Sequence, residues 1–183
     1  MDYTRNEDYY WRNRGYSADM SAGLYNGTTN VVFSSEGSEP VTLVDMLNWG
    51  KIDQSVDNAL ISSLITTARL ICEQYTNTSI ITRTIVADIN NVNGGFILPY
   101  GPVTNTPTAV NWEGIALTLV YNFSQIQTPY GRMAVTYTAG FTTVPEVYKT
   151  AIMQQVLFMY ENRGEGGISK EAKQLLNPLI RQK

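Results

Sequence analysis

The segment that most constrains the fold is Val144–Arg163, near the C-terminal end. Pro145 predicts a helix start, because its fixed φ suits the first turn and its missing N–H would have no partner there. Glu146 places negative charge at the positive end of the helix dipole. Apolar residues then recur with helical spacing, at Tyr148, Ile152, Val156, Met159 and Tyr160. The polar face is predicted to hold Lys149, Gln154, Gln155, Glu161 and Asn162. We therefore predict a long core helix, which needs a packing partner.

Two further helices are predicted in the first half of the chain. The first covers Thr42–Trp49, with Thr42 as N-cap and Asp45 three residues later, as in a capping box. The second runs from near Ser55 to about Tyr75, where apolar residues recur at spacings of three and four. It is the predicted partner of the long helix.

The middle of the chain changes to a strand pattern. The predicted strands are Ile80–Ile89, Ala109–Glu113, Ile115–Tyr121 and Arg132–Thr138. In the last of them, Met133, Val135 and Tyr137 share one face. The segments Asn90–Gly95 and Leu98–Val103 read as a turn and a bent connection. The predicted class is α+β. It has an α-helical bundle core of two N-terminal helices, a long helix and a short C-terminal helix, with a small antiparallel sheet or hairpin inserted between helices.

The two ends of the chain differ from this domain. Residues 1–40 are predicted to form an aromatic, polar arm that ends in the linker Ser34–Pro40, residues 41–176 the folded domain, and residues 177–183 a tail. The short helix Ser169–Leu176, capped by Ser169, precedes the tail. The arm is compatible with a disordered segment, with a docking arm that orders on a partner, or with a small folded appendage. Its candidate contact residues are Tyr9, Tyr10, Trp11 and Tyr16.

The composition excludes several classes of function. Charged residues are 16% of the 183 residues and the net charge is −3, so no basic field attracts nucleic acid. The chain has no histidine, which removes the commonest general base and metal ligand. Its single cysteine, Cys72, allows no internal disulfide and is predicted to be a small buried residue. No phosphate loop, nucleophile elbow or calcium loop is present, so no enzyme, cofactor or metal site is predicted.

Two further features bear on partners. No apolar run reaches the length of a membrane span, and the N-terminus lacks a signal-peptide pattern, so we expect a soluble protein that is not secreted. Thr, Asn, Ser and Tyr give the chain a neutral polar surface. Such a surface fits extensive contacts with other chains, and equally an ordinary soluble protein.

Four pieces of the sequence occur together in an order typical of one family. They are VTLVDMLNWGKIDQSVDNALISSLITTARLICEQYTNTSI at Val41–Ile80, LPYGPV at Leu98–Val103, VTYTAGFTTVPEVYKTAIMQQVLFMYENR at Val135–Arg163, and LLNPLIRQK at Leu175–Lys183. Over residues 41–183 the chain resembles the head–tail connector (adaptor, or head-completion) proteins of tailed bacteriophages. Residues 1–40 depart from the family pattern.

The resemblance implies a structural virion protein of the head–tail neck, assembled in the host cytoplasm. It would form a ring, expected to be a dodecamer, that binds the portal protein and extends the DNA channel. The ring would offer a platform for stopper or tail proteins, and genomic DNA would pass through it without sequence-specific binding. The alternative is a tail-completion or tail-terminator protein of related fold.

The resemblance also suggests contact residues. The candidate portal-binding residues are Leu175, Leu176, Pro178, Leu179, Ile180 and Arg181. The candidate contacts with a neighbouring subunit or the channel are Asn93, Phe96, Leu98, Pro99 and Tyr100. Packing of the tail or of this loop on their own domain is the alternative in both cases.

Overall fold

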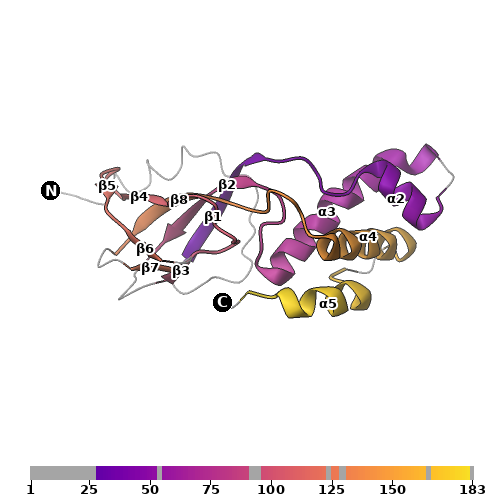
Figure 1. Cartoon of the computed structure of the whole chain (residues 1–183). Coiled ribbons are helices and arrows are strands. Elements are labelled where there is room, and N and C mark those ends of the chain that lie inside the picture. The colour runs from indigo at the N-terminus through magenta and orange to yellow at the C-terminus, as the bar shows by residue number, and fades with distance from the viewer. Residues whose placement is uncertain are drawn as a thin grey trace.

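The computed structural model describes residues 28–52, 55–90, 96–122, 125–127, 131–163 and 166–181, and it has an α+β fold (Figure 1). Helices gather at one end of an elongated molecule and strands at the other. The helices are α2 (Leu43–Gly50), α3 (Asn58–Thr76), α4 (Glu146–Glu161) and α5 (Lys170–Leu176), with short 3-10 turns at Ser55–Asp57 and Asn177–Leu179. We call the two ends the helical lobe and the sheet lobe. Each has its own apolar core.

The helical lobe is built around α4, which packs against α3 and α5 and also touches α2. This confirms the predicted pairing of the long helix with the helix that ends near Tyr75. Ile61 and Ile65 of α3 face Ile152 and Val156 of α4 in one fully buried cluster. Cys72 belongs to the same cluster and is wholly buried, as predicted.

Gln155 corrects the predicted polar face of α4. Its side chain is completely buried. The amide Nε2 donates to the carbonyl of Gly167 at 2.9 Å, and Oε1 accepts from the N–H of Ser169 at 2.7 Å. The amide thereby satisfies two backbone groups at the turn before α5, which sequence periodicity alone cannot anticipate.

The predicted caps are present. The hydroxyl of Thr42 accepts from the N–H of Asp45 at 3.1 Å, and the Asp45 carboxylate accepts from the N–H of Thr42 at 3.0 Å. This is a complete capping box. The Ser169 hydroxyl accepts from the N–H of Ala172 at 3.1 Å and fixes the start of α5.

The sheet lobe is larger than the small inserted sheet that we predicted. Its strands are β1 (Thr28–Glu36), β2 (Arg83–Ile89), β3 (Phe96–Ile97), β4 (Thr108–Asn111), β5 (Ala116–Leu117), β6 (Val120–Asn122), β7 (Gln125–Gln127) and β8 (Met133–Ala139). In the described part of the chain they form a five-stranded sheet in the order β1-β2-β8-β4-β5 and a three-stranded sheet in the order β3-β7-β6. Neighbouring strands pair antiparallel.

Strand β1 corrects the predicted boundary of the arm. Residues Thr28–Glu36 were assigned to the arm and linker, but they pair with β2 along its length. Val31 and Phe33, two residues apart, both pack on the core of the sheet lobe. Alternation of this kind indicates a strand, but two apolar residues among polar ones are too few to predict it from the sequence. The sheet therefore takes one strand from before the first predicted helix.

The predicted strand Ile115–Tyr121 is also corrected. The chain forms β5, leaves the large sheet, and enters the small one as β6. Ile115 is 58% exposed, whereas Leu119 and Tyr121 pack against the core of the sheet lobe. Alternation predicted extended backbone correctly, but it does not show which sheet a strand joins. The predicted connection after Tyr121 likewise contains a strand, β7.

Within the residues that the structure describes, none of the helices combines the length and apolar content that crossing a membrane requires.

Gly140, at the end of β8, is where the sheet lobe passes back to the helical lobe. Its φ is +125°, and a Cβ there would lie 2.2 Å from the carbonyl oxygen of Ile81. We predict that Gly140→Ala lowers the free energy of unfolding by about 3 kcal/mol or more, since it adds backbone strain to a steric clash. Gly131→Ala is the matched control, because no atom lies within 4 Å of the added Cβ. Urea unfolding followed by circular dichroism should separate the two variants, and equal midpoints would contradict the prediction.

Candidate assembly surfaces

A buried ionic cluster joins the two lobes, and its centre is Glu73 of α3. The carboxylate is 1% exposed. It accepts from Arg69 Nη1 at 3.0 Å, from Arg83 Nη2 at 2.8 Å and from the N–H of Ile80 at 2.7 Å. Because Arg83 is the first residue of β2, one side chain of the helical lobe holds the start of a central strand.

The cluster extends in two directions from Glu73. Arg69 also binds Glu39, with Nε to Oε2 at 2.9 Å and Nη2 to Oε1 at 3.1 Å, which fixes the segment between β1 and α2. Arg83 donates from Nε to the hydroxyl of Ser79 at 3.0 Å. Its guanidinium lies 3.7 Å from the centroid of the Phe33 ring, in a cation–π contact with β1. Two arginines therefore meet two glutamates, and three segments distant in sequence are fastened together.

The electrostatics of Glu73 reflect two opposing effects. Burial raises the pKa of the carboxyl group, and the guanidinium groups of Arg83 and Arg69 lower it. A buried charge of this kind is tolerated only when opposite charges and hydrogen bonds satisfy it. Removing one member of the cluster therefore leaves the remaining buried charges less well compensated. We did not predict this cluster. The available signal was Arg69, a charged residue next to Ala68 inside the apolar stripe of α3.

The C-terminal tail is fastened to its own domain. The N–H of Arg181 donates to the carbonyl of Thr76 at 3.0 Å, at the end of α3. The Tyr75 hydroxyl donates to Asn177 Oδ1. The Arg181 guanidinium lies directly over Gly101, where an added Cβ would be 1.2 Å from Nη1. The tail therefore contacts both the end of α3 and the loop after β3.

The predicted portal-binding residues divide by exposure. Leu176 is wholly buried, and Leu175 and Leu179 pack on the core of the helical lobe. These three side chains are therefore held by their own domain and do not form a loose tail. Pro178 and Ile180 are exposed, and Ile180 has 43% of its surface accessible.

The predicted contact loop also faces inward. Phe96, Leu98, Pro99 and Tyr100 are all buried in the sheet lobe. Tyr100 has φ +51° and donates its N–H to Asn77 Oδ1 at 3.1 Å. A bulky residue in the left-handed region is uncommon. These side chains therefore belong to the interior of the subunit and do not form an exposed surface.

Five other predicted contact residues cannot be placed. Asn93 and the arm residues Tyr9, Tyr10, Trp11 and Tyr16 lie outside the described residues.

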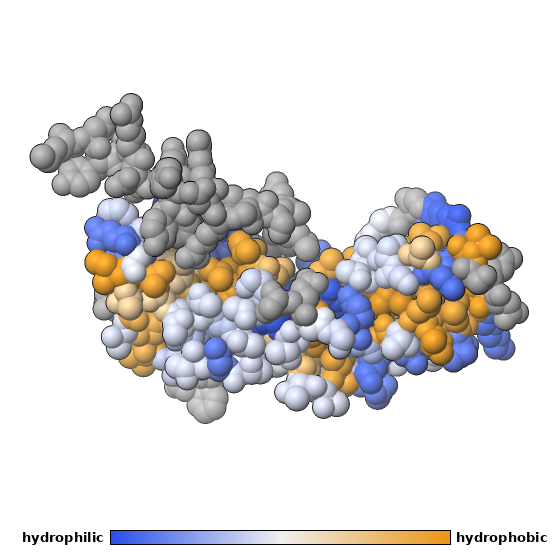
Figure 2. Space-filling model, turned by 90° about the horizontal axis from the view of Figure 1, so that it is seen from above, coloured by the Kyte–Doolittle hydropathy of each residue, from blue (hydrophilic) through white to orange (hydrophobic). Residues whose placement is uncertain are grey.

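Exposed apolar side chains mark two places that sequence reasoning did not single out. One is the β4–β5 hairpin and its continuation, with Trp112, Ile115 and Val120. The other is the far end of the helical lobe, with Val44, Trp49, Val56 and Leu60. Figure 2 shows hydrophobic residues gathered on the upper face of that lobe. Exposed apolar side chains that lie near one another are candidates for contacts with other chains.

Among the residues that are described, no three His, Cys, Asp or Glu side chains gather into a group that could hold a metal ion.

The cluster can be tested through Glu73→Gln. This change keeps the shape but removes the charge that two guanidinium groups share. We predict that the free energy of unfolding falls by about 3–5 kcal/mol, because the buried guanidinium groups of Arg69 and Arg83 lose the carboxylate that they share. Glu146→Gln is the control. Its ion pair with Lys149 is largely exposed, with a 2.6 Å separation, and should change stability by less than about 1 kcal/mol. Similar losses in thermal unfolding for both variants would contradict the central role of Glu73.

Comparison with known proteins gives structural neighbours only. No known family model matches the sequence, and no curated protein matches it. A chain in the neck of an empty gene transfer agent (GTA) particle, computed with C6 symmetry, has TM-score 0.68 and 16% identity, covering 85% of this chain and 97% of that chain. A chain in the virion of the native GTA particle has TM-score 0.67 and 17% identity, with coverage of 85% and 97%.

A third match, in the neck of the native GTA particle computed with C12 symmetry, has TM-score 0.60 and 17% identity, covering 83% of this chain and 96% of that chain. At this identity the likeness shows the fold, and it spans almost the whole length of each neighbour. The chain therefore has the fold of a chain in the neck of the phage-like GTA particle, in agreement with its resemblance to head–tail connector proteins.

Proposed function

We propose that this protein is a structural component of the neck of a tailed phage or phage-like particle, in which copies form a ring between the portal and the tail. The observation that carries the proposal is the fold match to GTA neck chains, which covers 83–85% of this chain and 96–97% of the neighbours. Two of these necks were computed with C6 or C12 symmetry. Repeated copies around an axis are what a ring adaptor requires.

The ring would extend the DNA channel below the portal and support stopper or tail proteins. The net charge of −3 suits this role, because strong phosphate contacts would hinder passage of the genome. The role is mechanical and needs no catalytic group. Assembly would take place in the host cytoplasm, after the head is filled.

The portal contact is proposed for the exposed part of the tail, Pro178 and Ile180, with Arg181 beside them. Leu175, Leu176 and Leu179 would support this contact from inside the domain by holding the tail in place. Truncation from Leu176 onward would be a poor test, because it removes a side chain of the core together with the contact.

The function is tested by electron microscopy of the purified full chain mixed with portal protein or with tailless heads. The expected result is a ring of this protein bound coaxially to the portal. A protein that binds tails made without heads, and leaves portals bare, would contradict the adaptor role and favour a tail-completion or tail-terminator protein.

The portal contact is tested by Ile180→Asp. Placing a charge at the exposed end of the tail should weaken portal binding about tenfold or more if this side chain is buried on docking. Thr106→Asp, at an exposed position of the sheet lobe away from the exposed apolar side chains, is the control and should bind as the wild type does. Sedimentation with portal measures the loss, and thermal unfolding checks that both variants stay folded. Undiminished binding by Ile180→Asp would remove the tail from the proposed contact.

A further inference from the structure

A groove of about 450 Å³ runs between α2 and α4 on the helical lobe. Its apolar lining is Pro40, Val41, Trp49 and Met153, and its polar lining is Asp45, Asn48, Glu146 and Lys149. Trp49 is 44% exposed and the neighbouring Val44 is 64% exposed. The groove thus combines unpartnered apolar surface with two carboxylates and one ammonium group, a net negative charge.

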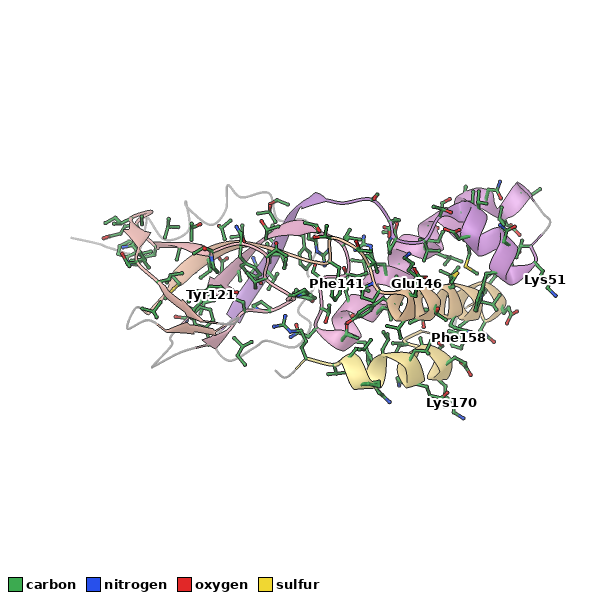
Figure 3. The ribbon with its side chains drawn as sticks, in the orientation of Figure 1. Lys51, Tyr121, Phe141, Glu146, Phe158 and Lys170 are labelled. Carbon is green, nitrogen blue, oxygen red and sulfur yellow. The ribbon has the colours of Figure 1, made fainter. Side chains whose placement is uncertain are left out.

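A surface of opposite character lies on α5. Lys170 and Lys173 are both exposed, one turn apart, with Gln174 beside them and Glu171 as the only acidic residue of the helix. Figure 3 shows Lys170 pointing away from α4. In Figure 1, α2 lies along one edge of the helical lobe and α5 along the other, with α4 between them. We call this surface the α5 outer face.

We propose that in the ring the α2–α4 groove of one subunit receives the α5 outer face of the next copy of the same chain. The inference rests on the ring of the proposed function. A closed ring of identical subunits needs two different, complementary surfaces on each subunit. The groove and the α5 outer face are distinct, lie on different sides of the helical lobe, and carry opposite net charge.

Charge decides between this pairing and the two symmetric alternatives. A groove-to-groove contact would place Asp45 and Glu146 against their own copies. A contact between two α5 outer faces would place lysines against lysines. Lys149 in the groove and Glu171 on α5 offset part of each repulsion, but only the mixed pairing joins surfaces of opposite net charge. Like charges across an interface are costly.

The side chains also match in shape and chemistry. A lysine can lay its methylene stem along apolar surface while its ammonium stays near a polar rim. The exposed indole of Trp49 offers both the apolar surface and a ring face that attracts a cation. Lys170 or Lys173 of the next subunit can use these together with the Glu146 carboxylate, which is 80% exposed beside the groove.

Disulfide cross-linking tests the proposal without altering its charges. The variant carries Asn48→Cys in the groove and Gln174→Cys on the α5 outer face, both at exposed polar positions. The native Cys72 should stay silent, because burial raises the pKa of its thiol to about 12. Under mild oxidation of the concentrated full chain we expect a ladder of linked oligomers that closes at the ring size. The matched control replaces Gln174→Cys by Thr106→Cys, which is exposed on the sheet lobe away from the β4–β5 hairpin.

Cross-linking in the groove variant should exceed the control about tenfold or more, and equal cross-linking would overturn the proposal. Adding Lys173→Glu should reduce the ladder about tenfold, and Glu146→Lys on the same chain should restore part of it. A ladder unaffected by Lys173→Glu would overturn the assigned charge pairing.

These outcomes are distinct from failure of the proposed function. If the wild type forms rings on portals while the groove variant links no better than its control, the function stands and the assigned surfaces are wrong. If the ladder forms but the protein binds neither portals nor heads, the surfaces stand and the neck function is wrong.

Discussion

The structure depends on one buried carboxylate, that of Glu73. It lies where α3 meets the sheet lobe, and it neutralises Arg69 on its own helix and Arg83 on β2. Through these arginines it also reaches Glu39 and the ring of Phe33. The two apolar cores are separate, so burial of apolar area within each lobe cannot by itself fix the angle between them. The ionic cluster restricts that angle together with backbone hydrogen bonds such as that from Ser79 to Gly101, because hydrogen bonds weaken when their geometry changes.

Sequence reasoning predicted the helices well, because each one carries its own signal. Pro145 and Ser169 mark starts, the capping box at Thr42 is local, and the stripes of α3 and α4 follow a regular period. The strands were harder. Strand β1 has only Val31 and Phe33 to show its period, and Ile115–Tyr121 divides between two sheets although its pattern is continuous. Which strand pairs with which is decided by contacts distant in sequence.

The candidate contact residues show the same limit. An apolar residue in a predicted tail or loop looks available to a partner, yet Leu176 lies in the core of the helical lobe and Leu98 in that of the sheet lobe. The exposed side chains around Trp49 and Trp112 could not be predicted from the sequence, because single exposed aromatics do not form a motif. The neutral polar composition was equally compatible with many contacts between chains and with an ordinary soluble protein, and it could not locate a surface.

The attachment of α5 has a mechanical consequence. The helix is held at its start by the Gln155 side chain and just beyond its end by the hydrogen bond from Arg181 to Thr76. Because hydrogen bonds hold both ends of this short helix to the domain, it cannot swing about either end. A load applied to α5 would pass to α4 through one fastening and to α3 through the other. The lobe would then move as a unit, which is what the proposed place in a ring would require.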